Sequence, residues 1–299
     1  MEILKLYPKC KDYLWGGQKL KTKYGKQTNK TPCAESWELS FHKDGLTWLS
    51  NGKTLAETVT EKELGENVKV FPFFPVLIKF IDAKDNLSVQ VHPSDEYALK
   101  HENSFGKTEM WYIVEAEEGA GIYLGFNRDV SGEEYESAIK GNRLTEFLNF
   151  YEVKAGECYF IPSGTIHAIG KGCLICEIQQ NSNLTYRVYD YGRKDKNGNE
   201  RELHIEKALK VTNLKKFEPI CFQGNTLGEC KYFHVEKIVV ACEKTLSTNK
   251  SSFHCITCIQ GSGMIDEKEI NQGDSFFIPA NYGNYHLYGN MSLIKTDIK

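Results

Sequence analysis

The sequence has 299 residues, 40% of them apolar and 26% charged, and its formal net charge is −3. A chain of this length buries one large core or two smaller ones, and the absence of a basic tract excludes a typical nucleic-acid-binding surface. No apolar run is long enough to span a membrane, and the N-terminal residues MEILKLYPKCKDY lack the apolar core of a signal peptide, so we expect a cytoplasmic protein without membrane partners.

The first part of the chain mixes short strand-like runs with turns. Residues 34–40 alternate in polarity, which places Glu35 and Trp37 on one face of a strand. The Leu, Ala and Glu content of residues 54–67 predicts a helix. The apolar run 72–82 predicts a buried strand.

The next stretch, residues 87–92, alternates strictly between apolar and polar side chains. An apolar face requires only a core, whereas a row of buried polar groups must be paired or must bind something. Ser94 caps a short predicted helix that ends at residue 101, and a strand-like run follows over residues 109–123. The two faces of the first strand are Leu87, Val89 and Val91 on the apolar side and Ser88, Gln90 and His92 on the polar side.

Helical and strand-like segments then follow one another. Ser131 and Glu134 form a capping box for a predicted helix over residues 132–140, and a second helix is predicted over residues 144–150. Asn197-Gly198 marks an exposed turn before a predicted helix at 203–211. Strands are expected at residues 157–161, 174–179 and 185–191.

The segment that follows a linker near residues 215–219 is almost entirely strand-like. GDSFFIP at 273–279 matches GECYFIP at 156–162 in spacing and character. An internal β repeat of this kind predicts two barrels. We therefore expect a mainly β fold of two jelly-roll-like barrels with small helical insertions, divided into residues 1–214 and 215–299.

Four polar side chains, distant in sequence, are a plausible ligand set for one divalent metal, with zinc the first candidate. They are Gln90, His92, Glu109 and His167. The pattern G-x5-P-x-G-x2-H over residues 156–167 resembles the second motif of the cupin barrels, so the two expected barrels are cupin barrels. The first cupin motif normally supplies H-x-H, but here a glutamine replaces the first histidine and the glutamate follows a helical insertion.

The second half contains His254 and His286 but lacks an equivalent motif. We therefore expect no metal in the C-terminal barrel and interpret both residues as packed or surface histidines.

Longer motifs resemble the type I mannose-6-phosphate isomerases, in their short bacterial form, over most of the chain. The resemblance implies zinc-dependent interconversion of mannose 6-phosphate and fructose 6-phosphate by proton transfer through a cis-enediol, with one zinc per chain held by the four residues above. The motifs are WGG at 15–17, AESWE at 34–38, QVHP at 90–93, GKTE at 106–109, GECYFIPSGTIH at 156–167 and QQNSNLTYRVYDY at 179–191.

The resemblance also implies catalytic residues. Arg187 occupies the position of the family's catalytic arginine, and a guanidinium that stays charged can stabilise a developing oxyanion. Lys107 shares the face of Glu109 if that segment is extended; it is an acid–base group, a phosphate-binding group or simply an exposed lysine. Glu177 matches a family position in the pocket and is a candidate acid–base residue, because its strand neighbours face the other way.

The substrate is expected to be a small phosphosugar, with its phosphate held by Ser88, Lys107 and Arg193. Longer family members often carry a lysine at the position of Arg193. Trp15 either lines the pocket or packs in the core. No glycine-rich phosphate loop precedes a helix, so we expect no bound nucleotide.

Two CxxC pairs raise the alternative of a structural zinc site. Cys173/Cys176 and Cys255/Cys258 both lie in strand-like runs, where residues three apart point to opposite faces. We therefore interpret them as buried free thiols in a reducing compartment.

Two other functions compete with the isomerase. A cupin oxygenase would use Fe(II) bound by two histidines and one carboxylate, but the glutamine, the arginine and the expected phosphate-binding groups suit a phosphosugar better than dioxygen. A non-catalytic sugar-binding double cupin would fit the degenerate second barrel but not the complete ligand set of the first.

Overall fold

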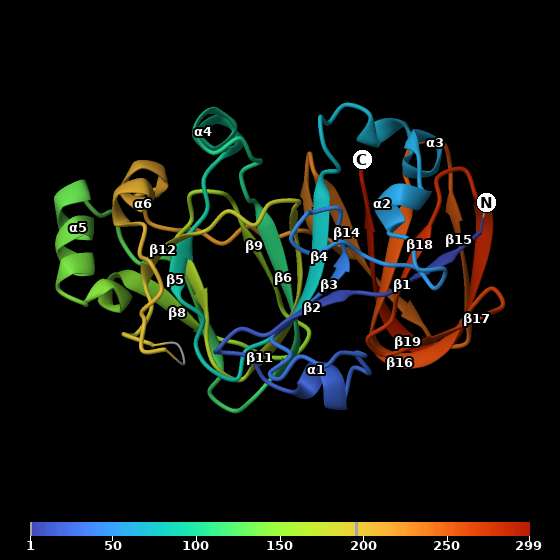
Figure 1. The fold of residues 1–299 in the computed structure, drawn as a ribbon, viewed down its shortest axis with the longest axis horizontal. Coiled ribbons are helices and arrows are strands. Elements are labelled where there is room, and N and C mark those ends of the chain that lie inside the picture. Colours follow the sequence, from blue (N-terminus) through green and yellow to red (C-terminus); the bar gives the residue numbers. More distant parts are fainter. Residues whose placement is uncertain (1, 195–196) are drawn as a thin grey trace.

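The computed structural model describes residues 2–194 and 197–299. The fold is mainly β, as predicted, and all the strands of the described residues belong to three sheets arranged one after another along the long axis of the molecule (Figure 1). Among the described residues, none of these sheets closes on itself. The expected barrels are therefore built by sheets that face one another and by one sheet that bends, and not by closed rings of strands.

The central sheet separates the two halves of the molecule. Because side chains alternate along a strand, Ile81 and Ile175 pack on one face, and Phe80 and Cys176 on the other. Both faces are covered, which explains why the strand sequence VLIKFID is buried throughout. The strand order is β2 (Lys9–Lys11), β3 (Glu35–Leu39), β4 (Val76–Asp82), β11 (Cys173–Gln180), β6 (Glu109–Ala116) and β9 (Cys158–Ile161).

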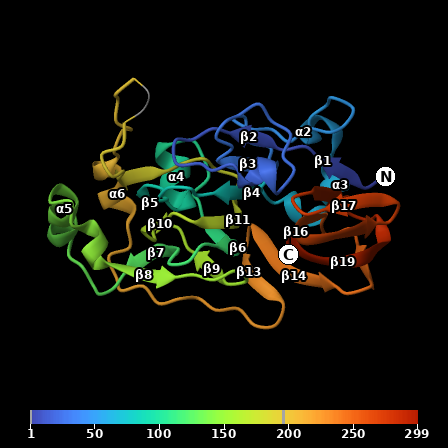
Figure 2. The ribbon, with the colours of Figure 1, turned by 90° about the horizontal axis from the view of Figure 1, so that it is seen from below.

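The outer sheet faces one side of the central sheet. Its outward face is covered by α5 (Gly132–Lys140) and α6 (Ile205–Val211), which pack on Val89 and Val91 (Figure 2). Leu87 differs from the prediction: it precedes the strand and packs inward with the core between the sheets. The strand order is β12 (Tyr186–Tyr189), β5 (Val89–Val91), β10 (His167–Ile169), β7 (Gly121–Phe126) and β8 (Leu148–Glu152).

The C-terminal sheet covers the other face of the central sheet. One face contributes Phe233 and Phe277 to the core shared with the central sheet, and the sheet bends so that its second face encloses a core of its own around Ile256 and Leu293. The first strand of the chain pairs with β18 at its edge. The strands are β1 (Leu4–Leu6), β13 (Thr226–Cys230), β14 (Phe233–Val240), β15 (Glu243–Thr248), β16 (His254–Ile265), β17 (Lys268–Asn271), β18 (Ser275–Ile278) and β19 (Gly283–Asp297).

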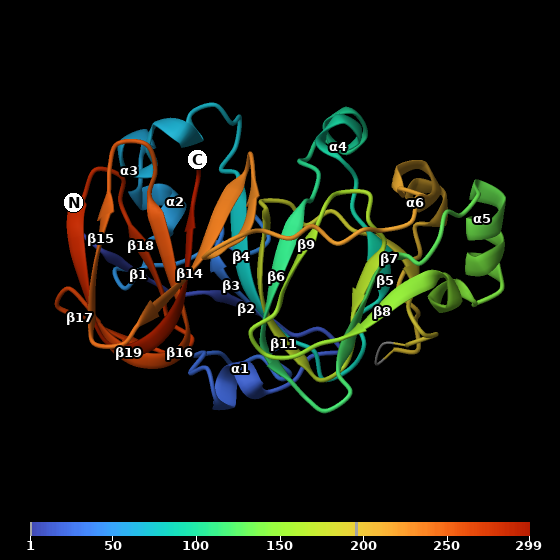
Figure 3. The ribbon, with the colours of Figure 1, turned by 180° about the vertical axis from the view of Figure 1, so that it is seen from behind.

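The segment between α6 and β13 runs along the outer and central sheets before it reaches the C-terminal sheet (Figure 3). Phe217 N donates a hydrogen bond to Phe126 O at 2.9 Å, and Phe222 packs edge-on against Phe160 with ring centroids 5.3 Å apart. This segment therefore follows the surface of the first half, although its composition predicts a linker.

Three of the predicted helices form as expected, among them α6 within the predicted range 203–211. Ser94 caps α4 (Asp95–His101), and Ser131 with Glu134 forms the capping box of α5. The short helix α1 (Lys19–Thr22) was not predicted.

The helix predicted over residues 54–67 is wrong. The chain forms three short helices there, because Thr60 begins a second capping box only six residues after the first one at Thr54. They are α2 (Leu55–Thr58), α3 (Glu61–Leu64) and the 3-10 helix η1 (Glu66–Val68).

The helix predicted over residues 144–150 is a single 3-10 turn, η2 (Leu144–Phe147), followed directly by β8.

None of the helices in the described part of the chain has both the length and the apolar composition of a membrane-spanning segment.

All ten cysteines are free thiols. Cys173 packs between the outer and central sheets, whereas Cys176 packs on the opposite face of the same strand. Cys255 and Cys258 are divided between two cores in the same way. The two cysteines of each pair therefore point to opposite faces of their strand, as predicted.

Candidate active site

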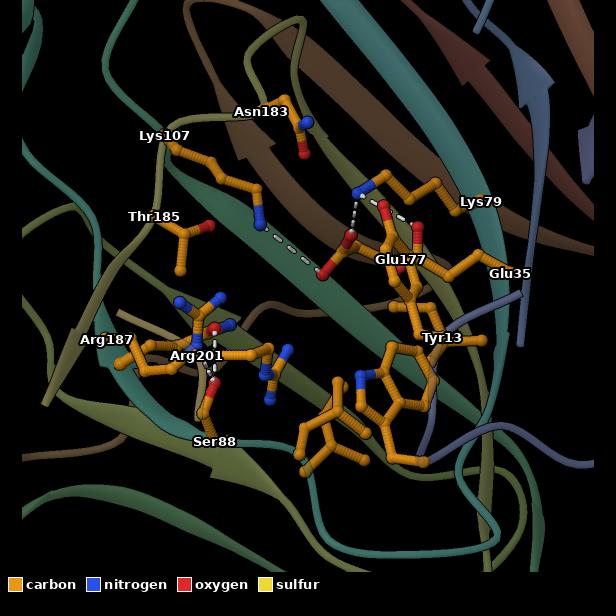
Figure 4. Close-up of a pocket in the computed structure, with 15 residues that line it drawn as sticks. Tyr13, Glu35, Lys79, Ser88, Lys107, Glu177, Asn183, Thr185, Arg187 and Arg201 are labelled. Carbon is orange, nitrogen blue, oxygen red and sulfur yellow. Dashed lines mark hydrogen bonds and ion pairs between the residues drawn. The ribbon is translucent and has the colours of Figure 1, made fainter. Parts of the chain in front are cut away.

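A polar cavity lies between the central and outer sheets (Figure 4). Strands β3, β4 and β11 contribute Glu35, Lys79 and Glu177 from the central sheet. Ser88 and Gln90, from the polar face predicted for this stretch, approach from the outer sheet. The cavity therefore collects charged side chains that are far apart in sequence.

Two histidines and a glutamate meet beside this cavity, in a group of possible metal ligands. Glu109 opens β6 and His167 opens β10, and His167 is the register partner of Gln90. Glu109 Oε1 lies 3.3 Å from His167 Nε2, and Glu109 Oε2 lies 3.6 Å from His92 Nε2. The sheet pairing thus brings three of the four predicted ligands into contact, with the fourth, Gln90 Nε2, 3.4 Å from His167 Nε2.

Both imidazoles are oriented by backbone carbonyls. Nδ1 of His92 donates to Leu184 O and Nδ1 of His167 donates to Thr165 O, each at 2.8 Å. Because a carbonyl oxygen only accepts, the proton of each neutral ring is on Nδ1, and the Nε2 lone pair faces the cluster. Burial, followed by the charge of Lys107, lowers the pKa of His92 well below its usual value and that of His167 to about 4. Both rings are therefore neutral at neutral pH, with Nε2 free to bind a metal.

Glu109 is the carboxylate of this group. Its Oε1 atom is buried and has no hydrogen-bond partner within the described residues. Burial raises its pKa to about 7, although the Lys107 charge acts in the opposite direction. The Lys107 ammonium contacts Oε2 of Glu109 and lies 3.1 Å from His92 Nε2, so a cation already compensates this buried carboxylate.

This donor set fits zinc. Two imidazole nitrogens, a carboxylate with one unsatisfied oxygen and an amide are the ligand types that zinc accepts while leaving room for substrate. Gln90 would bind through its amide oxygen, which requires half a turn of the amide from its orientation in this structure.

A chain of alternating charges forms one wall of the cavity. Lys79 Nζ lies 3.9 Å from Glu35 Oε2 and 3.2 Å from Glu177 Oε2, and Lys107 Nζ lies 3.7 Å from Glu177 Oε1 (Figure 4). Trp111 Nε1 donates to Glu177 at 3.1 Å. Burial alone would raise the pKa of Glu177, but the two ammonium groups outweigh it and hold this pKa at about 2. Glu177 is therefore ionised at neutral pH.

Arginines gather at the other side of the cavity. Arg187 Nε donates to Ser88 Oγ at 3.2 Å, and its Nη1 donates to Glu202 O at 3.0 Å. Arg201 also lines the cavity. Burial, and next the charge of Arg201, lower the pKa of Arg187, because the two guanidinium groups lie close together.

Two predicted phosphate-site residues take different places. Trp15 lines the cavity, is only 4% exposed and stacks on Tyr13. Arg193 does not line it: its guanidinium bonds to Asn86 O and Asp190.

Sequence reasoning assigned no site role to three charged residues of this cavity: Glu35, Lys79 and Arg201. Lys79 carried a signal, since it is the one charged residue inside the run VLIKFI. Glu35 carried another, because it shares a face with Trp37 and accepts that indole's hydrogen bond at 2.7 Å. Arg201 follows a polar turn and carried none.

A second group of possible metal ligands lies in the C-terminal sheet and consists of His234, Glu236 and Asp297. The Lys295 ammonium lies 2.5 Å from Glu236 and 2.7 Å from Asp297, so both carboxylates are already paired. Nearby, His254 bonds to Tyr285 at 2.9 Å. This group is an ion-paired network inside the bent sheet.

Known proteins resemble the chain along almost its entire length. Residues 3–119 match the family described as "Phosphomannose isomerase type I, catalytic domain", and residues 224–298 match "Mannose-6-phosphate isomerase, cupin domain". The chain is 36% identical to the mannose-6-phosphate isomerase ManA of Bacillus subtilis, over 99% of each chain. It is 35% identical to the mannose-6-phosphate isomerase of Streptococcus mutans, over 95% of this chain and 94% of that protein.

A solved structure gives the same result. The mannose 6-phosphate isomerase from Bacillus subtilis superposes with a TM-score of 0.90 at 32% identity and covers 99% of both chains.

Proposed function

Since the chain belongs to the type I mannose-6-phosphate isomerase family, we propose that it interconverts mannose 6-phosphate and fructose 6-phosphate through a cis-enediol, with one zinc ion. The observation that carries this proposal is the buried group of His92, Glu109 and His167 beside a cavity lined by paired lysines and glutamates. We further propose that the protein acts in the cytoplasm, with residues 1–214 as the catalytic domain and 215–299 as a metal-free cupin domain.

The metal would be held by Gln90, His92, Glu109 and His167. Zinc bound there supplies a Lewis acid that lowers the energy of negative charge on the substrate oxygens. Both histidines are preset for this role by the carbonyls that accept their Nδ1 protons.

An aldose–ketose isomerisation moves a proton between two neighbouring carbons of the open-chain sugar. We assign the acceptance of that proton to Glu177, which is ionised and lines the cavity, although the two ammonium groups that lower its pKa also make it a weak base. The Lys107 ammonium, 3.7 Å away, would donate a proton to an oxygen. The Arg187 guanidinium faces the same cavity and would stabilise negative charge as it develops on the enediol oxygens.

The phosphate is the part of the substrate that does not react. Ser88 lines the cavity and would bind it, and Lys107 is a phosphate-binding residue only if it does not act as the proton donor. Arg193 would contribute through Asp190, to which it is bonded. Trp15 would form an apolar wall for the sugar ring.

The test is an isomerase assay on the purified protein with mannose 6-phosphate, before and after treatment with a chelator and after zinc is restored. We expect turnover that is lost with the metal and recovered with zinc. Oxygen uptake with bound iron would instead indicate an oxygenase, and sugar phosphate binding without turnover would indicate a binding protein. Either result would refute the proposal.

A further inference from the structure

We propose that Arg201 binds the substrate phosphate directly and that Arg193 is a positioning residue behind it. This inference rests on the proposed function, since it assigns the phosphate end of a hexose 6-phosphate. It concerns a residue that the sequence motifs do not single out.

Arg201 is held in one orientation by a carboxylate. Its Nε donates to Asp190 Oδ2 at 2.7 Å and its Nη2 donates to Asp190 Oδ1 at 2.6 Å, so the pair is bidentate. Asp190 is nearly buried, with 6% of its side chain exposed, against 29% for Arg201. This pairing occupies one edge of the guanidinium and leaves the edge formed by Nη1 and Nη2 for a second anion.

The unoccupied edge belongs to a side chain that reaches the cavity. Arg201 is one of its lining residues and lies beside Arg187 and Ser88 (Figure 4). The Arg201 guanidinium donates to Asp190 through Nε and Nη2 only. Its Nη1 atom therefore makes no hydrogen bond with a described side chain. A tetrahedral oxyanion seated here would meet the Arg201 guanidinium and the Ser88 hydroxyl, while Arg187, the register partner of Gln90, is left for the reacting end of the sugar.

Arg193 is arranged differently. Its Nη1 donates to the carbonyl of Asn86, its Nη2 donates to Asp190, and the guanidinium lies over the Tyr191 ring at 5.4 Å. Both terminal nitrogens are therefore used, and the side chain is not part of the cavity wall. What Arg193 can do is hold Asp190, which in turn holds Arg201.

The charges at this end favour an anion. Arg193 and Arg201 share the single carboxylate of Asp190, and the Arg187 guanidinium lies nearby, so this end of the cavity carries two positive charges in excess. Arg187 has no carboxylate within salt-bridge distance among the described residues; its partners are a hydroxyl and a carbonyl oxygen. The Glu202 carboxylate is 82% exposed and lies 3.8 Å from His204, outside the cavity wall. A phosphate dianion would balance the two excess charges.

This end is also at the right place relative to the metal ligands. Ser88 Oγ, which contacts Arg187, lies 3.5 Å from Oε1 of Gln90. The anion site and the proposed metal site therefore adjoin along the same stretch of chain, so one sugar phosphate can contact both.

The experiment measures mannose 6-phosphate isomerisation and, separately, the affinity of the metal-loaded protein for inorganic phosphate by calorimetry. In Arg201→Gln, we expect KM and the phosphate dissociation constant to rise by roughly 10- to 100-fold, because charge-assisted hydrogen bonds are lost. The change in kcat should be smaller. Arg201→Lys, which keeps the charge without the bidentate geometry, should lie between Arg201→Gln and the unaltered protein.

Two further variants separate binding from folding. Arg193→Gln should weaken phosphate binding less than Arg201→Gln, because it acts only through Asp190. Arg128→Gln is the control, since Arg128 pairs with Glu134 on the exposed surface at 2.9 Å and should change neither quantity. Circular dichroism on each variant verifies that the fold is retained, and Arg201→Lys serves as the test if Arg201→Gln does not fold.

The outcomes are distinct. Unchanged KM and phosphate affinity in Arg201→Gln and Arg201→Lys would overturn the inference, and so would a larger effect of Arg193→Gln than of Arg201→Gln. A third outcome separates the two proposals: the unaltered protein does not isomerise mannose 6-phosphate, but it binds phosphate and the Arg201→Gln variant binds it more weakly. The proposed function would then fail while the anion site stands.

Discussion

Lys79 and Glu177 form a buried ion pair between adjacent strands, with 3.2 Å between Nζ and Oε2 and neither side chain more than 5% exposed. They are register partners across β4 and β11. Lys79 also faces Glu35 and lies 4.9 Å from the centre of the Trp37 ring. Burial would lower the pKa of Lys79, but Glu35 and Glu177 outweigh it and raise this pKa above its usual value. Removing the charge of Lys79, Glu35 or Glu177 alone would therefore leave a buried opposite charge without its partner.

Replacing Lys79 by Met should destabilise the protein by about 3–5 kcal/mol at pH 7, because Glu177 and Glu35 lose their shared cation while they remain buried. The free energy of unfolding in urea measures this. Lys215→Met is the control: Lys215 pairs with Asp129 at the exposed surface, and its replacement should leave stability unchanged. Equal stability of Lys79→Met and the unaltered protein would contradict the buried pairing.

His167→Ala should remove both the metal and the activity. It takes away one of the two imidazoles and leaves Glu109 with fewer partners. Metal content by elemental analysis should fall from one ion per chain to nearly none, together with turnover. His101→Ala, on the exposed end of α4, should keep both. A fully loaded and active His167→Ala would rule out this residue as a ligand.

Arg187→Ala should retain the metal and lose most turnover, by roughly 100-fold or more, if the guanidinium stabilises the developing oxyanion. Arg187 contacts Ser88 but none of the three clustered ligands, so metal content should not change. If Arg187→Ala keeps the metal and nearly full activity, the role assigned to Arg187 is wrong.

The C-terminal sheet should contribute a pH-dependent part of the stability. Burial would raise the pKa of Asp297, but the hydrogen bond from His234 and the charge of Lys295 outweigh it and lower this pKa to about 2. A carboxyl whose pKa falls on folding stabilises the native state above its unfolded pKa of 3.8, and this contribution is lost as the pH falls towards 2.

Asp297→Asn should therefore cost about 2 kcal/mol at pH 7, and the difference from the unaltered protein should shrink below about pH 4. Urea unfolding between pH 7 and pH 3 measures it. A constant difference across this range would indicate that the Asp297 charge does not stabilise the fold.

Local signals in the sequence predicted local structure well. The capping residues Ser94 and Ser131 located α4 and α5, and the period of two placed Glu177 on the face opposite Cys176. The same reasoning failed at residues 54–67, where helix composition was outweighed by the second cap at Thr60.

Features that depend on distant pairing were not predictable from the sequence. Leu87 faces inward because the strand begins only at Val89. Arg201 reaches the cavity because Asp190 holds it there, and nothing in the turn that precedes it indicates that contact. The pairing of β1 with β18 joins residues more than 260 positions apart and leaves no local trace.

That pairing has a consequence for how the protein is made. Leu4 and its neighbours leave the ribosome first, yet their partner strand around Phe277 is among the last segments to be synthesised. Phe80, on the face of the central sheet that the C-terminal sheet covers, shares a core with Phe277. That face stays uncovered until the C-terminal sheet has been synthesised. A nascent chain that has completed every residue of the catalytic cavity therefore still exposes a large apolar face. The last eighty residues, which carry none of that cavity's chemistry, determine when the enzyme is finished.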